Sequence, residues 1–244
     1  MVHIEIVTEK PVPKNAILLE GFQGVGLVAT LAAEYIANKT NSKLIGYVSS
    51  DVFPPMAILS DGQLRHPTRI YSFKEHGQNF LIISSELPIP HGITDAVARE
   101  LVAFAKKNNV KEIVSLEGIT TPKPPVQSNV YFAANMDKLN KRLIKFAKQL
   151  KNGIIVGISA QVLLQARAKK VPAFSIMAEA HAEFPDGIAA AEIIKKLNAL
   201  YKLDIDVSDL IKESKKFEEK IWALVEKARQ IRSAQGEPKK TYIG

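Results

Sequence analysis

The sequence contains no cysteine and no long apolar run. With no cysteine among its 244 residues, disulfides, thiolate zinc sites and cysteine nucleophiles are excluded, and an intracellular protein is favoured. No apolar stretch reaches the length of a transmembrane helix, and the first twenty residues lack the basic and apolar regions of a signal peptide. These absences predict a cytoplasmic protein that does not insert into a membrane.

Several catalytic and metal-binding motifs are also missing. The five histidines show neither HxH nor HExxH spacing, so we predict no metal site. The segment "GISAQ" around Ser159 lacks the second glycine of a nucleophile elbow. No Gly-Lys-Ser/Thr triplet of a Walker loop occurs. The sequence therefore predicts no catalytic residue and no cofactor.

Basic residues are in excess, and the formal net charge is +8. From Lys212 onward there are nine Lys or Arg against five Glu, so half of this excess lies in the last 33 residues. No arginine-rich run and no cluster of aromatic and basic residues appears. A solvated basic helix explains this balance better than a nucleic-acid groove does, so we predict no nucleic-acid partner.

Apolar runs alternate between strand and helix periods along most of the chain, which predicts an α/β fold. Two hairpin signals, around residues 60–62 and 76–77, add antiparallel strands and make the expected sheet mixed. The remaining expectations are strands at 16–20, 42–50, 110–119, 153–159 and 171–179, helices at 25–38, 94–109, 137–150, 160–170 and 186–202, and an exposed proline-rich loop at 120–129. We expect one globular domain, residues 1–207.

The end of the chain differs from the rest. Ser208 could cap a long amphipathic helix over residues 208–235, with Gly236 and Pro238 as stop signals before a flexible tail, residues 236–244. Apolar residues recur along this helix in steps of four and three, and the candidate oligomer contacts among them are Phe217, Ile221, Leu224, Ala228 and Ile231. This spacing fits packing within the protomer as well as a contact between subunits, so both interpretations remain open.

Gly21, Gly24 and Gly26 lie between the first predicted strand and helix, where a nucleotide-binding protein would hold a phosphate. Their order is G-x-x-G-x-G, the reverse of the Rossmann fingerprint, although Asp51 does follow the next strand. We therefore favour a structural role, in which glycine permits a sharp turn and close packing of the helix on the sheet.

Several predicted strands end in an acid, namely Glu20, Glu86, Glu117 and Glu179. The carboxyl ends of parallel strands line the usual ligand crevice of an α/β sheet, and carboxylates gathered there could act as acid and base or bind a divalent metal. Alternatively, these residues mark only where each strand leaves the core. Strand order decides whether the acids converge, and the sequence does not supply it.

Seven segments resemble one known family when their order and spacing are taken together. They are "EGFQGVGLVAT" (20–30), "SDVFPPMA" (50–57) with "GQLRHPTRIY" (62–71), "ELPIPHGITDAVARELVAFAKKNNV" (86–110), "SLEGI" (115–119), "GIIVGIS" (153–159) and "AEFPDGIAAAEIIKKL" (182–197). They resemble the proteasome assembly chaperone family, and more narrowly its archaeal members. The resemblance implies a three-layer α/β/α sandwich similar to nucleoside phosphorylases and hydrolases. It also implies a non-enzymatic assembly chaperone or proteasome accessory factor that forms oligomers.

The resemblance also implies a way of binding a partner. Family members that dock on the proteasome core particle use a C-terminal hydrophobic residue, a tyrosine and any last residue, inserted between α-subunits where the carboxylate pairs with a lysine. This chain ends in Thr241, Tyr242, Ile243 and Gly244, our candidate partner-binding residues. The tyrosine is third from last instead of second from last, and Thr241 takes the hydrophobic place. Alternatively, the tail is solvated and binds no partner.

Two functions therefore follow from the sequence. The first is a homo-oligomeric, proteasome assembly chaperone-like protein that binds proteasome α-subunits or a related chaperone without catalysing a reaction. The second is a nucleoside or nucleotide hydrolase or phosphorylase that uses the strand-end acids.

Overall fold

The computed structural model describes residues 2–60, 62–120, 128–182 and 184–210, and residues 212, 213, 216, 220, 223, 224, 226, 227, 229 and 230 near the C-terminus. Its strands are β1 (Ile4–Thr8), β2 (Ile17–Gly21), β3 (Lys43–Ser50), β4 (Ile58–Ser60), β5 (Gln63–Arg65), β6 (Thr68–Glu75), β7 (Gln78–Ser85), β8 (Glu112–Thr120), β9 (Val130–Ala134), β10 (Lys148–Gln149) and β11 (Ala173–Ala180). Its α-helices are α1 (Val28–Lys39), α2 (Thr94–Lys107), α3 (Asp137–Leu143), α4 (Gly157–Lys169) and α5 (Gly187–Tyr201). Short 3₁₀ helices, η1 (Val25–Leu27) and η2 (His91–Ile93), precede α1 and α2.

Nine of the strands form one mixed sheet, in the order β1-β3-β6-β7-β2-β8-β11-β9-β10. The four central strands β7, β2, β8 and β11 are parallel, whereas β1, β3 and β6 pair antiparallel on one side and β9 pairs antiparallel with β11 on the other. The predicted mixed α/β sheet is therefore confirmed. The hairpin of β4 and β5 forms a separate two-stranded sheet.

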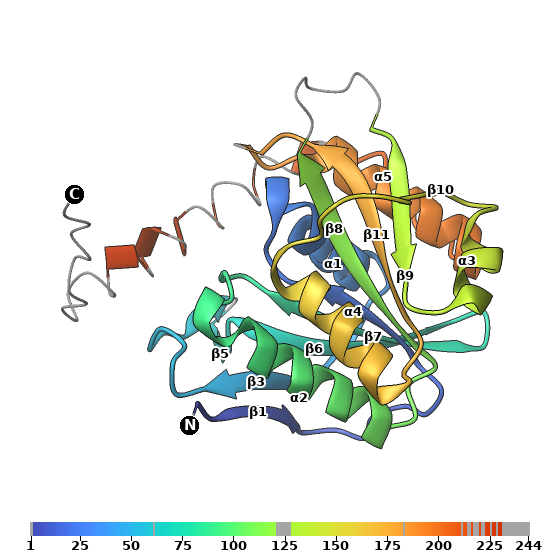
Figure 1. The fold of residues 1–244 in the computed structure, drawn as a ribbon. Coiled ribbons are helices and arrows are strands. Elements are labelled where there is room, and N and C mark those ends of the chain that lie inside the picture. Colours follow the sequence, from blue (N-terminus) through green and yellow to red (C-terminus); the bar gives the residue numbers. More distant parts are fainter. Residues whose placement is uncertain are drawn as a thin grey trace, which may run out of the picture.

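Helices cover both faces of the large sheet, which gives the three predicted layers (Figure 1). Helices α2 and α4 pack together on one face, and α1 packs with α5 on the other. The central strands are apolar on both sides because each side faces a helix layer. Helix α1 is buried along almost its whole length because it lies between the sheet and α5.

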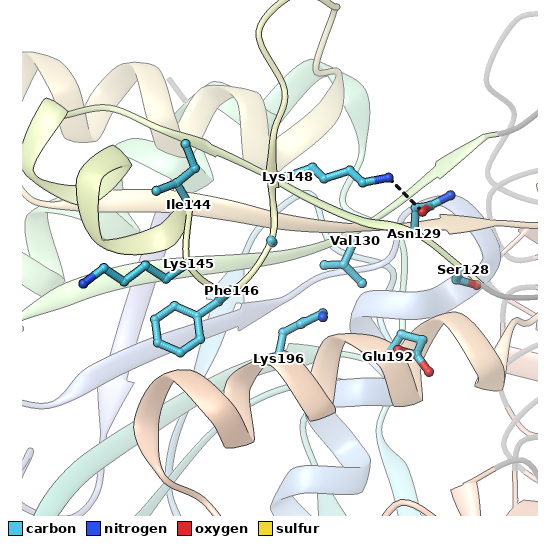
Figure 2. Close-up of a pocket in the computed structure, with 10 residues that line it drawn as sticks. Ser128, Asn129, Val130, Ile144, Lys145, Phe146, Lys148, Glu192 and Lys196 are labelled. Carbon is cyan, nitrogen blue, oxygen red and sulfur yellow. Dashed lines mark hydrogen bonds between the residues drawn. The ribbon is translucent and has the colours of Figure 1, made fainter.

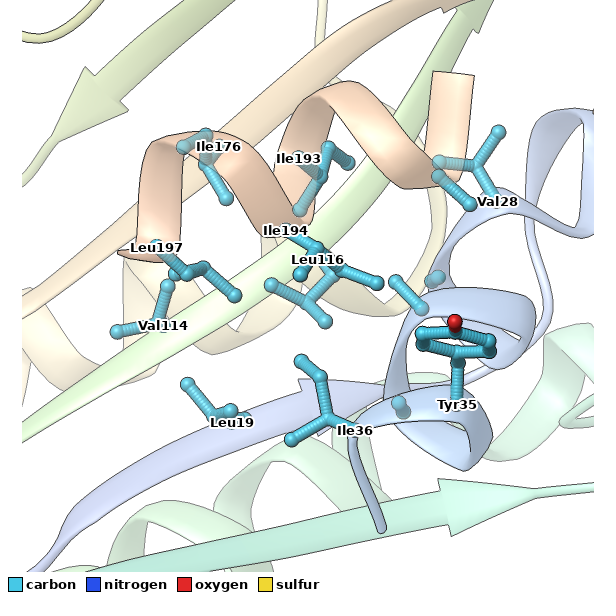
Figure 3. Packing of buried hydrophobic residues seen from close by; sticks show 14 of the residues in the cluster. Leu19, Val28, Tyr35, Ile36, Val114, Leu116, Ile176, Ile193, Ile194 and Leu197 are labelled. Atoms are coloured by element: carbon cyan, nitrogen blue, oxygen red, sulfur yellow. The ribbon is translucent and has the colours of Figure 1, made fainter. Parts of the chain in front are cut away.

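The larger core cluster fills the space between the sheet and the α1–α5 layer (Figure 3). Leu19 of β2 and Leu116 of β8 meet Ile36 of α1 and Ile194 of α5 there, and all four side chains are buried. Tyr35 is also buried, and its hydroxyl donates to the carbonyl of Asp206 at 2.8 Å. This bond ties the segment after α5 to α1.

Some element predictions differ from the structure. The apolar segment 153–159 was expected to be a strand, but α4 begins within it at Gly157, whose φ of +77° is incompatible with a strand. Ile154 and Val156 are 90% and 70% exposed, so their side chains do not enter the core, whereas Ile158, already part of α4, is buried. The predicted helix 137–150 ends at Leu143, and β10 follows. Strands β1 and β9 were not predicted.

The C-terminal region is described only in part. Leu210 is fully buried in the core of the protomer, and the described residues between 212 and 230 are helical. Among the five candidate oligomer contacts, only Leu224 belongs to the described residues, and it is half-buried. Phe217, Ile221, Ala228, Ile231 and the tail, residues 236–244, lie outside the described residues, as does most of the proline-rich loop. Within the described part of the chain, no helix combines the length and apolar character needed to cross a membrane.

Candidate functional site

Two of the strand-end acids lie together at the carboxyl ends of neighbouring parallel strands. Glu20 is on β2 and Glu117 is on β8, two residues beyond Ser115, which is in register with Glu20. After β2 the chain continues to β3, on one side of this strand pair, and after β8 it continues to β9, on the other side. The acid pair therefore lies at the topological switch point, the place where the connections of neighbouring strands diverge and where α/β proteins usually bind ligands.

Ser159, in the first turn of α4, joins the two carboxyl groups. Its Oγ lies 2.6 Å from Glu117 Oε2 and 3.4 Å from Glu20 Oε2, and the backbone N–H of Phe22 donates to Glu20 Oε1 at 3.1 Å. The hydroxyl has one proton, so it can donate to only one carboxylate. The arrangement is satisfied when Ser159 donates to Glu117 and accepts from a protonated Glu20.

Burial dominates the electrostatics of this pair. Glu20 is fully buried, and the loss of solvation raises its pKa to about 7. Burial also raises the pKa of Glu117 to about 8, and the nearby charge of Glu20 adds to the effect, while the bond from Ser159 opposes it. The pair therefore takes up protons near neutral pH, which is the property of a general acid or base.

The glycine turn closes over this acid pair. A side chain on residue 24 would collide with Glu117 Oε1, and one on residue 21 would collide with Ala33 of α1. Gly26 has φ +59°, and a Cβ there would lie 2.7 Å from the carbonyl oxygen of His181. The three glycines thus occupy positions with no room for a side chain, with Gly24 directly against the Glu117 carboxylate.

The other strand-end acids have separate partners. Glu86, after β7, forms an ion pair with buried Arg69 of β6, which also reaches Glu34 Oε1 of α1 at 3.3 Å. Burial opposes the charge of Arg69, but Glu34, Tyr71 and Glu86 outweigh it and raise its pKa. Lys220 of the C-terminal helical residues reaches Glu86 Oε1 at 3.2 Å.

Glu179 and Asp51 also lie in separate surroundings. Burial alone would raise the pKa of Glu179, but hydrogen bonds from Asn129 and Tyr131 outweigh it and lower the pKa. Asp51 accepts a hydrogen bond from the backbone of His3 beside β1, at the far side of the sheet. Only Glu20 and Glu117 therefore converge as the sequence pattern suggested.

Sequence reasoning missed Arg69 and the bridging role of Ser159. The signal for Arg69 was available, because an arginine in the strand "TRIYSF" must find a buried anion. Ser159 had been considered only as a nucleophile. In the described residues, no group of three His, Asp or Glu side chains is placed to hold a metal ion together.

A concave region lies away from the acid pair, near the edge of the sheet formed by β9 and β10 (Figure 2). This pocket has a volume of about 550 Å³ and is lined by residues 128–130 at the start of β9, by the segment 144–148 and by α5. In Figure 2, Lys196 and Glu192 project from α5, and Lys148 donates to Asn129 Oδ1 at 3.2 Å on the opposite side. The pocket does not include the acid pair.

Comparison with known proteins gives a consistent set of relatives. The model of the PAC2 family matches residues 18–225. The uncharacterized protein MJ0106 of Methanocaldococcus jannaschii is 27% identical over 230 residues, with 94% of each chain covered.

Solved structures agree with this match. The structure of Pyrococcus furiosus PbaA, described as an archaeal homolog of proteasome-assembly chaperone, is 30% identical and covers 97% of this chain and 100% of its own, with a TM-score of 0.82. Pyrococcus furiosus PbaB, described as an archaeal proteasome activator, has a TM-score of 0.77 over 91% of this chain and 98% of its own. At 20% identity, PbaB shows the shared fold alone.

Proposed function

The chain belongs to the PAC2 family, and we propose that it is a non-enzymatic, proteasome assembly chaperone-like protein of the cytoplasm. The observation that carries this proposal is the match to PbaA over almost the full length of both chains. In this role the protein binds proteasome α-subunits, or a related assembly chaperone, as a homo-oligomer.

We assign the partner contact to the C-terminal residues Thr241, Tyr242, Ile243 and Gly244. A buried tyrosine and a carboxylate paired with a lysine give affinity from few residues. The helical residues before the tail support this assignment, because Leu210 in the core and Lys220 on Glu86 attach that segment to the domain. Attachment at these two points holds the described start of this segment against the domain.

The contact between copies belongs, in this proposal, to the stripe of Phe217, Ile221, Leu224, Ala228 and Ile231. Leu210, which begins the same spacing, is buried within the protomer. Leu224 is only half-buried, so part of the stripe is available for another subunit.

A pull-down with purified proteasome α-subunits tests the tail. We expect full-length protein to retain α-subunits, and both a chain ending at Gly236 and Tyr242→Ala to lose at least about tenfold of that binding, because the aromatic anchor is gone. Lys240→Ala, a matched change in the same tail, should bind within about twofold of the unchanged protein. Equal binding by all four proteins would remove the tail from the proposal, and no binding by any would remove the α-subunit partner.

One observation favours the alternative function, a nucleoside-directed hydrolase or phosphorylase. Glu20 and Glu117 lie at the switch point with pKa values raised toward neutrality, as acid–base catalysis requires. Against it, Gly24 packs on the Glu117 carboxylate, and the other strand-end acids have partners elsewhere. A rise in melting temperature with purine nucleosides would favour this alternative.

A further inference from the structure

The pocket beside α5 carries positive charge that the protein itself leaves uncompensated. Lys145 and Lys196 line it and form no ion pair with any acid in the described residues. Lys148 binds an amide oxygen, that of Asn129. The one acid in the lining, Glu192, is already paired with Lys195 at 2.8 Å. An anionic group entering this pocket would therefore meet cations without displacing an internal partner.

Apolar surface lies directly beside these lysines. Ile144 is 62% exposed, although a large apolar side chain gains free energy on burial. Phe146 is half-buried next to it, and Val130 of β9 forms a buried part of the lining. In Figure 2, Ile144, Phe146 and Val130 lie among the three lysine side chains. A simple inorganic anion would use only the charged part of this lining.

The combination of positive charge and apolar surface indicates which class of ligand fits this pocket. We propose that this pocket is a docking site for an acidic segment of a partner protein, with one carboxylate near Lys145, another near Lys196 and a neighbouring apolar side chain against Ile144 and Phe146. The volume of about 550 Å³ accommodates a few side chains of such a segment. The excess of basic residues in the chain, +8 overall, favours encounter with acidic partners.

This contact is separate from the proposed contact of the C-terminal tail. The residues that line the pocket lie in the segments 128–130 and 144–148 and on α5, and none lies beyond 196. Peptide binding can therefore succeed or fail independently of α-subunit capture by the tail. A failure of either proposal is thus recognisable by itself.

The test is a titration of full-length protein into the fluorescein-labelled peptide acetyl-Glu-Glu-Leu-Phe-Glu-Glu-amide, followed by fluorescence anisotropy at low salt. The double variant Lys145→Glu/Lys196→Glu should bind about tenfold more weakly, because two attractions become repulsions. The matched control Lys106→Glu/Lys107→Glu changes the net charge equally but lies on α2, on the opposite face of the sheet, and should change affinity by less than about twofold. Circular dichroism melts verify that each variant is folded.

A second variant separates specific docking from general charge attraction. Ile144→Ser alters an exposed side chain, so the fold should tolerate it, and it should weaken the peptide about threefold while leaving a peptide with Gly-Gly in place of Leu-Phe unaffected. Equal weakening by both double variants would overturn the proposal. So would full displacement of the peptide by equimolar inorganic phosphate, or preferential binding of a single-stranded oligonucleotide in the same pocket.

Discussion

Strand β8 carries an acid near each of its two ends, and the two acids have opposite surroundings. Glu112, near its amino end, is 2% exposed, and its carboxylate receives Arg142 at 2.6 Å and the Tyr201 hydroxyl at 2.9 Å. Glu117, near its carboxyl end, has as neighbours the Ser159 hydroxyl, the backbone of Gly118 and a second acid, Glu20.

The difference shows what a buried carboxyl group does with and without a cation. Hydrogen bonding and charge attraction from Glu112 outweigh the effect of burial on Arg142 and raise the pKa of that guanidinium. Arg142 therefore stays charged, and the contacts of Glu112 join α3 and α5 to β8. At the other end, no cation among the described residues opposes the effect of burial, and the acids hold protons toward neutral pH. One end is therefore a structural tie, and the other is a group that titrates.

The largest expected effect is at the paired end. Glu112→Gln should lower the free energy of unfolding by about 2–3 kcal/mol, because Arg142 loses its counter-charge and one of the two oxygens that accept from Arg142 and Tyr201 becomes an NH2 donor. Partial solvent screening of Arg142 keeps the loss below that of a fully buried pair. Urea unfolding at pH 6 and pH 8 measures it, and the loss should be similar at both. Glu100→Gln, an exposed change of the same charge on α2, should cost less than about 0.5 kcal/mol. A loss as small as that of the control would contradict the structural role of the pair.

The acids at the unpaired end should make the free energy of unfolding depend on pH. The folded pKa values of Glu20 and Glu117 lie above the value of about 4.5 in the unfolded chain, so the folded protein binds more protons between those values. The stability from this pair is present at low pH and is lost as pH rises from about 4.5 through about 8.

Glu20→Gln removes one of these titrations. The variant should be more stable than the unchanged protein at pH 9 by on the order of 2 kcal/mol, with a flatter decline of stability between pH 6 and pH 9. Thermal unfolding across that range measures the slope, with Glu100→Gln again as the control. If Glu20→Gln and the control gave the same slope as the unchanged protein, the proton-binding account of the acid pair would be wrong.

Much of the fold could be predicted from the sequence because the central strands and helices have clear apolar patterns. Segments such as 16–20 and 94–109 have clear apolar patterns and are bounded by turn residues, and they correspond to β2 and α2. Strands β1 and β9 were missed because, unlike β2, each is only partly buried and depends on pairing with distant parts of the chain. The prediction for the segment 153–159 was wrong because Ile154 and Val156 are exposed and α4 begins at Gly157.

The candidate site was predictable only in its parts. Acids at strand ends could be recognised from the pattern, but their convergence depends on strand order, which placed β2 beside β8 and left Asp51 at the far side. Whether a buried acid has a structural role or titrates near neutral pH depends on whether an arginine from another element pairs with it. Arg142 comes from α3 and Arg69 from β6, and neither could be assigned to its partner before the topology was known.

Protein binding is the central claim, and the mass of the protein in solution tests it most directly. Light scattering on a sizing column should give the protein alone a mass that is a multiple of its 26.9 kDa protomer and, after mixing with proteasome α-subunits, one peak whose mass equals the sum of both components. Separate elution of the two proteins at unchanged masses, with this protein at the mass of one protomer, would contradict the account.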